Sequence, residues 1–375
     1  MNNNICSTKP IDRYQTMRIG IVTQPLEMNY GGILQNWALQ QALRRLGHDP
    51  ITIDAYERYS TPHYLYNWMR TALSRILGKK ANWPKRYRGS LRNELMGQFV
   101  EQHIAKTRVM WDYKRSVVNR YHLDALVVGS DQVWRARYNG GHLEDMYLRF
   151  AEGLPLKRVA YAASFGIDEW EYSPEQTAAC SALAQQMDAI SVREASGVDL
   201  CREHLGVEAT CVLDPTMLLD AAGYQDIIDD QWDAGEPYLA VYCLDITPAK
   251  EEFFNRLAQE RGLTVRYFPA GWKSTLTVGQ WLAMFSHASL VVTDSFHGTV
   301  FSILFGREFY TMCNPGRGNT RIVGLLRDLA LEDRLVSDSE PVEPADSTIN
   351  WEDVYARLEK RRQESQTFLE KAFNN

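Results

Sequence analysis

The chain has 375 residues, of which 45% are hydrophobic and 23% charged, and this length and composition favour two globular domains with a sizeable core. Its net charge of −6 argues against nucleic-acid binding, so an anionic ligand would need a local basic site. The six cysteines form no C-x-x-C pair, which predicts reduced thiols in a cytoplasmic protein rather than disulfides or a zinc site. No apolar run approaches the roughly 18 residues of a membrane helix, and no signal-peptide core is present.

From Met17 onward, short apolar runs alternate with helical patterns. A run at 19–22, a glycine turn, a helical pattern at 33–46 and a second run at 51–54 form a βαβ unit, which implies a parallel sheet. The further predicted strands are 125–128, 158–162, 190–192, 210–213, 238–243, 264–268 and 290–293. The further helical patterns are 173–187, 194–205, 248–261, 277–287, 297–305 and 319–330.

This rhythm predicts an α/β fold of two doubly wound, Rossmann-like domains that face a cleft. The predicted parts are a flexible extension (1–16), a first domain (17–219) with an insertion (58–93), a second domain (235–340) and a final helix (350–373) that packs back on the first domain. Ligands bind at the carboxyl ends of parallel strands. We therefore expect the loops after strands 125–128 and 290–293 to open into one cleft between the halves.

The strongest candidate for chemistry is the stretch Thr-Asp-Ser-Phe-His-Gly, where a strand runs into a helix. Free N–H groups and the positive end of the helix dipole form an anion site around Ser295, His297 and Gly298. Histidine exchanges a proton near neutral pH, and glycine permits close approach of a ligand. We therefore predict a functional role for His297, rather than a structural role in which both ring nitrogens are hydrogen-bonded within the fold.

Two arginines are candidates for holding an anion. Arg193 follows strand 190–192, and its planar guanidinium suits a carboxylate or a phosphate. A role in capping the next helix together with Glu194 explains it equally well. A second basic candidate is the pair Asn319 and Arg321.

Polar loops after the other strands suit a hydroxyl-rich ligand. The turn Asn-Tyr-Gly-Gly is not the G-x-G-x-x-G fingerprint of a dinucleotide site, and an ordinary helix start explains it as well. Asp, Gln and Trp after strand 125–128 have the composition of a carbohydrate-binding loop. An Asp that caps a helix and a Trp that lies in the core would give the same sequence pattern. The candidate acceptor-binding residues are Asn29, Tyr30, Gly31, Gly32, Gln35, Ser130, Asp131, Gln132, Trp134 and Ser164.

The insertion at 58–93 holds nine basic residues, no acidic residue and several tyrosines and tryptophans. Its apolar residues between Trp68 and Leu77 fall on one helical face. A basic amphipathic helix with aromatic residues is typical of a membrane surface. A solvated surface insertion is the alternative, and nucleic-acid binding would need a recognised module that the sequence lacks.

Five motifs in order resemble the polysaccharide pyruvyl transferase family, with the likeness spanning residues 17–335. They are NYGGILQ (29–35), VVGSDQVW (127–134), ISVRE (190–194), DPT (214–216) and TDSFHGTVFS (293–302). The resemblance implies a glycosyltransferase-B-like architecture. It also implies transfer of a pyruvyl group from phosphoenolpyruvate to two hydroxyls of a saccharide, which gives a cyclic ketal and phosphate.

The resemblance also implies roles for individual residues. Members of the family carry a histidine at the position of His297 and an arginine that matches Arg193. Some members have Arg-Leu before this histidine, where the present chain has Ser-Phe, so we expect Arg321 to supply the missing cation. We predict His297 as general acid and phosphate ligand, Arg193 as carboxylate clamp and Asp131 as the base for the acceptor hydroxyl. The donor-binding set is then Arg193, Ser295, His297, Gly298, Asn319 and Arg321.

The expected co-substrate is phosphoenolpyruvate, and neither a metal nor another cofactor is expected. The basic insertion fits a polyprenyl-diphosphate-linked saccharide acceptor handled at an anionic membrane surface, on its cytoplasmic face. One alternative is a glycosyltransferase that uses a nucleotide sugar on the same architecture. A non-catalytic carbohydrate-binding protein is a further alternative, and the presence of both His297 and Arg193 argues against it.

Overall fold

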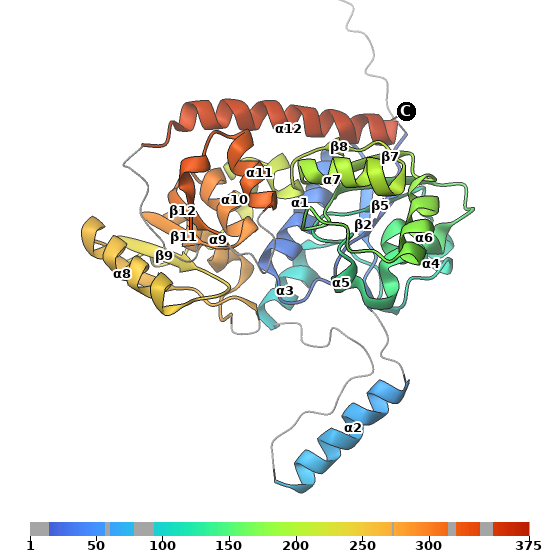
Figure 1. The fold of residues 1–375 in the computed structure, drawn as a ribbon, viewed down its shortest axis with the longest axis horizontal. Coiled ribbons are helices and arrows are strands. Elements are labelled where there is room, and N and C mark those ends of the chain that lie inside the picture. Colours follow the sequence, from blue (N-terminus) through green and yellow to red (C-terminus); the bar gives the residue numbers. More distant parts are fainter. Residues whose placement is uncertain are drawn as a thin grey trace, which may run out of the picture.

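The structure is a computed structural model that describes residues 15–56, 61–78, 94–271, 274–313, 320–337 and 348–374. Most of the predicted extension, the second part of the predicted insertion and Asn319 lie outside these residues. Two α/β halves make up the body of the molecule, and each contains one parallel sheet (Figure 1).

The first half is built on a six-stranded sheet in the order β2-β1-β5-β6-β7-β8, and all of its strand pairs are parallel. Most of its strand residues are buried, as expected where helices cover both faces of a parallel sheet. The strands are β1 (Arg18–Val22), β2 (Asp49–Thr52), β5 (Ala125–Val128), β6 (Lys157–Ala163), β7 (Ala189–Val192) and β8 (Thr210–Cys211). The helices are α1 (Tyr30–Arg45), α3 (Glu94–His103), α4 (Ser116–Tyr121), α5 (Ala136–Asn139), α6 (Pro174–Ala184) and α7 (Ala195–Leu200).

Short elements complete this half. Strands β3 (Ala55–Tyr56) and β4 (Met110–Trp111) form a small parallel pair at its edge. The 3-10 helices η1 (Gly140–Tyr147) and η4 (Pro215–Leu218) follow α5 and β8.

The second half contains a five-stranded parallel sheet in the order β10-β9-β11-β12-β13. Its strands are β9 (Tyr238–Tyr242), β10 (Thr264–Tyr267), β11 (Leu290–Thr293), β12 (Glu308–Met312) and β13 (Leu335–Val336). Its helices are α8 (Pro248–Arg261), α9 (Val278–His287), α10 (Phe296–Leu304) and α11 (Thr320–Asp328).

The sheet orders confirm the predicted α/β fold of two Rossmann-like units. In each sheet the strand order reverses beside the first strand, between β1 and β5 in one half and between β9 and β11 in the other. Such a reversal leaves a crevice at the carboxyl ends of the two strands, which is where ligands bind in doubly wound sheets. A ligand-binding site is therefore expected next to these two reversal points.

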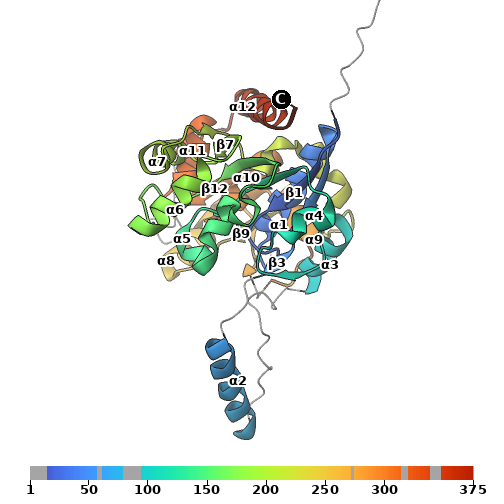
Figure 2. The same ribbon diagram turned by 90° about the vertical axis from the view of Figure 1, so that its right-hand side faces the viewer.

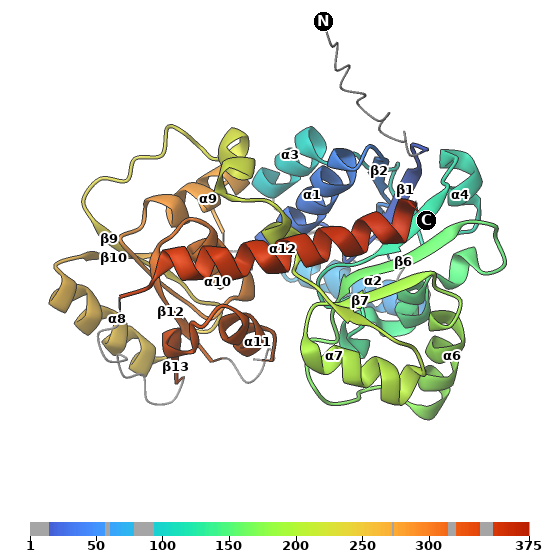
Figure 3. The same cartoon turned by 90° about the horizontal axis from the view of Figure 1, so that it is seen from above.

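The last helix, α12 (Trp351–Asn374), runs across both halves (Figure 3). Leu369 and Phe373, near its carboxyl end, belong to the apolar cluster that covers β1, as predicted for a helix that returns to the first half. Its first turns contact the second half instead, where the Tyr355 hydroxyl donates to the carbonyl of Ile303 (3.3 Å). The helix thus ties the two halves together.

Helix α2 (Thr61–Ile76) stands apart from both halves in two perpendicular views (Figures 1 and 2). It agrees with the helix predicted inside the insertion. Its exposed large apolar residues are Leu65, Tyr66, Trp68, Met69, Leu73 and Ile76, and Leu77 follows directly after it. None of the described helices is long and apolar enough to cross a bilayer.

Candidate active site

A cavity of about 460 Å³ lies between the halves, at the point where both strand orders reverse. Residues that follow β1, β5 and β11 line it, together with residues of β9 and α11. Its polar and aromatic lining includes Gln24, Asn29, Asp131, Gln132, Tyr138, Tyr242, Asp294, Ser295, Phe296, His297 and Arg321. The sequence correctly placed the loops after β5 and β11 in one cleft.

His297 lies in the first turn of α10 and is held between the two halves. A Cβ atom on Gly31 of α1 would lie 1.9 Å from His297 Nδ1, so only glycine at this position lets the imidazole approach α1 so closely. The opposite ring nitrogen, Nε2, lies 3.8 Å from Oδ2 of Asp214, which is an ion-pair separation rather than a hydrogen bond. His297 is thus fixed by one residue on each side of the ring.

Asp214 is the carboxylate behind His297, and it is fully buried. Its Oδ1 accepts hydrogen bonds from the N–H and hydroxyl of Thr216 (3.0 and 2.7 Å), and its Oδ2 accepts from the hydroxyl of Ser130 (3.1 Å). Burial alone would raise the pKa of Asp214, but His297 and Arg193 hold it well below its usual range. The site therefore contains a carboxylate with a lowered pKa beside an imidazole.

Arg193 packs against the same carboxylate. Its Nη1 donates to Asp214 Oδ2 (2.7 Å), its Nη2 donates to Asp131 Oδ1 (3.3 Å), and its guanidinium lies 4.6 Å from the ring centre of Phe296. The side chain is only 1% exposed. Arg193 and His297 are therefore close together, as predicted, and they meet through Asp214.

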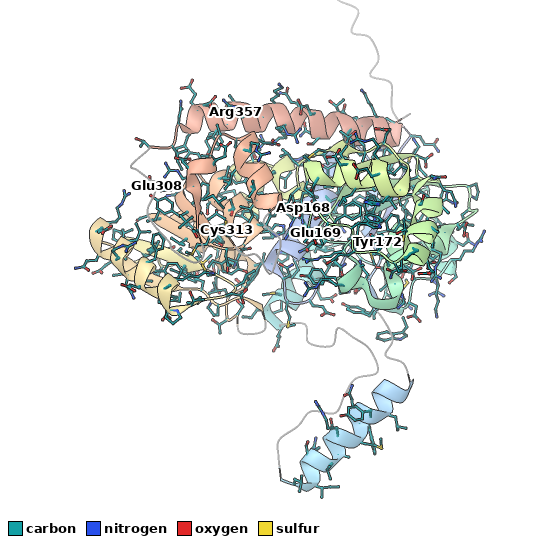
Figure 4. All side chains as sticks on the ribbon, viewed as in Figure 1. Asp168, Glu169, Tyr172, Glu308, Cys313 and Arg357 are labelled. Carbon is teal, nitrogen blue, oxygen red and sulfur yellow. The ribbon has the colours of Figure 1, made fainter. Side chains whose placement is uncertain are left out.

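The role of Arg193 as a donor clamp stays a prediction. Arg193 does not line the cavity that contains His297, and both ends of its guanidinium are already engaged by carboxylates. It borders a cavity of about 480 Å³, which shares Phe296 and Arg321 with the interdomain cavity and to which α12 contributes Arg357 (Figure 4). Arg193 is a positioning residue for Asp214 and Asp131.

Arg321 of α11 is the arginine in the wall of the interdomain cavity. Its Nη1 lies 3.8 Å from Asp131 Oδ1, and its guanidinium lies 5.6 Å from the ring centre of Phe296. Burial and the neighbouring charge of Arg193 lower the pKa of Arg321 to about 10, so it remains a cation at neutral pH. Arg321 and His297 thus line the same cavity, and the role of Arg321 as the substitute cation stays a prediction.

Asp131 lines the cavity between these cations. Burial would raise its pKa, but Arg193, His297 and Arg321 hold the pKa of Asp131 below its usual value. Its Oδ2 also accepts a hydrogen bond from the Asn29 amide (3.4 Å). In this arrangement Asp131 is a counter-ion to Arg193 and Arg321, and its role as the base for the acceptor hydroxyl stays a prediction.

Comparisons with known proteins show the family of this chain. Residues 29–313 match the family described as polysaccharide pyruvyl transferase, which is most of the chain. The chain belongs to the polysaccharide pyruvyl transferase family. No curated protein matches it.

Several solved structures are similar to this pyruvyl transferase family member at low sequence identity. One is a putative UDP-N-acetylglucosamine 2-epimerase from Listeria monocytogenes (11% identity, 96% of this chain and 92% of that chain covered, TM-score 0.48). Another is a glycosyltransferase from Rickettsia africae (10% identity, 96% and 95% covered, TM-score 0.43). A third is a UDP-GlcNAc 2-epimerase from Neisseria meningitidis bound to UDP-GlcNAc (8% identity, 94% of each chain covered, TM-score 0.42).

Trp134, which was predicted to bind the acceptor, is a structural residue in this family member. Trp134 is 0% exposed, its ring stacks on Tyr147 at 4.7 Å, and its indole N–H donates to the carbonyl of Met146 (3.0 Å). Tyr172, labelled in Figure 4, donates to the Trp134 carbonyl (2.5 Å). No face of this indole is open to a sugar ring, so the prediction for Trp134 is wrong.

Tyr30 joins the two halves. Its ring stacks on Trp281 of α9 at 5.1 Å, and its hydroxyl donates to the carbonyl of Leu276 (2.6 Å) and hydrogen-bonds with Ser274. Because the side chain is fully buried in the shared core, the predicted contact of Tyr30 with the acceptor is also wrong.

The buried polar residues of the predicted acceptor set shape the loops behind the cavity. Oε1 of Gln35 accepts the N–H of Ser130 (3.0 Å), and the Ser164 hydroxyl donates to Glu194 (3.0 Å). Gln35, Ser130 and Ser164 are 0% exposed, so they position the site without touching a ligand. Of the remaining set, Asn29, Asp131 and Gln132 line the cavity, Gly31 admits His297, and Gly32 lies against the Asn29 side chain.

The start of α10 offers less to an anion than the sequence suggests. The Ser295 hydroxyl caps the helix by accepting the Gly298 N–H (3.4 Å), so this N–H is already engaged. A Cβ atom on Gly298 would lie 2.3 Å from Thr293 Oγ1. Ser295 lines the cavity, whereas the predicted donor contact of Gly298 is replaced by close packing on β11.

Proposed function

We propose that this protein transfers the pyruvyl group of phosphoenolpyruvate to two hydroxyls of a saccharide, forming a cyclic ketal and releasing phosphate. Membership of the polysaccharide pyruvyl transferase family supports this reaction class. The observation that carries the proposal is the pairing of His297 with the buried carboxylate of Asp214 in the wall of a cavity that also contains Arg321.

The reaction begins with a proton. His297 donates it from its imidazole to the methylene carbon of phosphoenolpyruvate, which leaves a cationic C2. A saccharide hydroxyl forms a C–O bond to C2 and loses its proton to the now neutral imidazole. The bond between C2 and the phosphate oxygen then breaks, and phosphate leaves with the electron pair. The second hydroxyl adds to C2, gives its proton to the released phosphate, and closes the ketal.

The surrounding charges suit this sequence of steps. Arg321 faces an anionic group of the donor, and Asp131 holds the guanidinium in place. Asp214 stays ionised, orients the imidazole and faces the positive charge that a protonated His297 carries. Arg193 keeps both carboxylates in position.

The test is consumption of phosphoenolpyruvate in the presence of a panel of saccharides, followed as release of inorganic phosphate. Acceptor-dependent release, together with a product mass that fits one added pyruvate ketal, is the expected result. Parallel incubations contain UDP-sugars in place of phosphoenolpyruvate. Consumption of a UDP-sugar but not of phosphoenolpyruvate would replace the proposal with glycosyl transfer.

We further propose that the acceptor is presented at an anionic membrane surface, as a lipid-linked saccharide. The exposed apolar residues of α2 support this, because an isolated helix with an apolar face is stable where that face is buried in lipid headgroups. The basic residues of segment 58–93, with no acidic residue among them, complement anionic lipid.

A further inference from the structure

A second cavity, of about 310 Å³, adjoins the interdomain cavity inside the first half. The loop after β1, the short pair β3 and β4, and the segment from α5 into η1 enclose it. Gln24 and Tyr138 line both cavities, so the two spaces meet at these side chains. The proposed mechanism gives this second space no role.

The lining of the second cavity combines phenol rings with polar groups. Tyr56, Tyr113 and Tyr138 supply the rings, and the Tyr113 ring is fixed by stacking on Phe150 at 5.3 Å. Ring faces pack on the C–H surfaces of sugars, while carboxylate, imidazole and amide groups bind their hydroxyls. This mixture suits a hydroxyl-rich ring better than a purely apolar ligand.

The charges at the second cavity argue against an anionic occupant. Asp112 and Glu27 line it, and His142 is the histidine among its lining residues. His142 Nδ1 already lies 3.0 Å from Asp145, and its Nε2 lies 3.8 Å from Asp112. A diphosphate or uronate would therefore meet carboxylates, so the expected occupant is a neutral sugar.

Gln24 is built into the junction. Its amide nitrogen donates to Asn139 Oδ1 (2.8 Å) and to the carbonyl of Gln132 (3.3 Å). Within the described residues, its carbonyl oxygen Oε1 accepts no hydrogen bond. This oxygen is thus an oriented acceptor for a hydroxyl at the boundary between the two cavities.

We propose that the second cavity binds the neutral sugar next to the one that receives the pyruvyl group, so that the enzyme recognises at least a disaccharide. The inference rests on the proposed function, because it assigns the reacting sugar to the interdomain cavity. The volume of the second cavity is at the lower end of the range for small-molecule sites, which suits one sugar ring rather than a longer chain.

The experiment measures saccharide binding without any donor, by saturation-transfer NMR and titration. The probes are methyl β-glucoside, methyl β-galactoside, cellobiose and lactose, together with glucuronic acid. We expect at least one disaccharide to bind more tightly than its monosaccharide. Tyr138→Ala should weaken the binding of this disaccharide about tenfold, which is the usual effect of losing one aromatic contact. Tyr138 is exposed, so this variant should fold, and Asp112→Ala provides a second, independent change.

The matched control is Tyr267→Ala, which removes an exposed tyrosine from the sheet of the other half. Equal affinities for mono- and disaccharides, tighter binding of glucuronic acid, absence of binding to every probe, or equal losses in Tyr138→Ala and the control would overturn the inference. Disaccharide binding that depends on Tyr138, in a protein that does not consume phosphoenolpyruvate, would retain the subsite and refute the proposed reaction instead.

Discussion

His297 Nε2 faces Asp214 Oδ2 at 3.8 Å, across the boundary between the two halves. Asp214 follows β8 of the first sheet, whereas His297 begins the helix after β11 of the second. The pair forms only when the halves are docked, and the shared core of α1 and α9 holds them in that arrangement. A proton-transfer group built across a domain boundary is thereby kept rigid by the fold.

The first prediction concerns the proton donor. His297→Asn should lower the turnover of phosphoenolpyruvate by about 10²–10⁴-fold, the usual contribution of a general acid or base. Thermal unfolding should change little, because the shorter polar side chain fits the same space. Phosphate release and circular dichroism are the measurements, and near-normal turnover in a folded variant would remove His297 from the mechanism.

The two buried arginines should respond differently to substitution. Arg321→Gln should raise the KM for phosphoenolpyruvate by about 10–100-fold, because a charged hydrogen bond contributes roughly 1.5–3 kcal/mol. Arg193→Gln should instead lower the free energy of unfolding by about 3–5 kcal/mol, since Asp214 and Asp131 lose their common partner. Steady-state kinetics and urea unfolding separate the two effects. A donor KM that rises only in the Arg193 variant would reverse these assignments.

Adjacent glycines at the start of α1 provide a matched pair. A Cβ at Gly31 would collide with the His297 ring, whereas a Cβ at Gly32 would lie 3.2 Å from the end of the Asn29 side chain, which can move. Gly31→Ala should therefore reduce activity by at least about tenfold, given the sensitivity of catalysis to small displacements. Gly32→Ala should retain most activity. Equal activities of the two variants would show that the contact between α1 and His297 does not position the ring.

The strands β12 and β13 of the second sheet were not predicted. The sequence predicts the other strands of the two large sheets because buried parallel strands are continuous apolar runs, and the strand predicted at 125–128 matches β5 (Ala125–Val128). It also places His297, since a histidine at a strand-to-helix junction has few structural explanations. Asp214 lies in the motif DPT but was given no role, because an aspartate before proline and threonine is typical of a helix cap, and it does accept the Thr216 N–H. The burial of Trp134 and Arg193 could not be predicted, because the direction of a loop side chain depends on packing between distant segments.

The buried carboxylates make a prediction for acid stability. The pKa values of Asp214 and Asp131 are lowered in the folded protein, so these groups stabilise it above the ordinary carboxyl pKa of about 4. As the pH falls through that value, the unfolded chain takes up protons first and the stabilisation is lost. Urea unfolding between about pH 6 and pH 3 should show a shallower decline for Asp214→Asn than for the unaltered protein. Parallel pH profiles would contradict the assignment.

The final prediction concerns α2 and lipid. The protein should co-sediment with vesicles that contain phosphatidylglycerol, more weakly with pure phosphatidylcholine, and less at high salt because the charge attraction is screened. Leu73→Glu places a charge on the exposed apolar face and should weaken binding by at least about tenfold, given roughly 1.5–3 kcal/mol for burial of a leucine side chain. Ser74→Glu adds the same charge one residue further along, about 100° around the helix and away from the apolar face, and should lose less. Equal losses in the two variants would attribute the binding to net charge alone, and indifference to vesicle composition would contradict the membrane role of the helix.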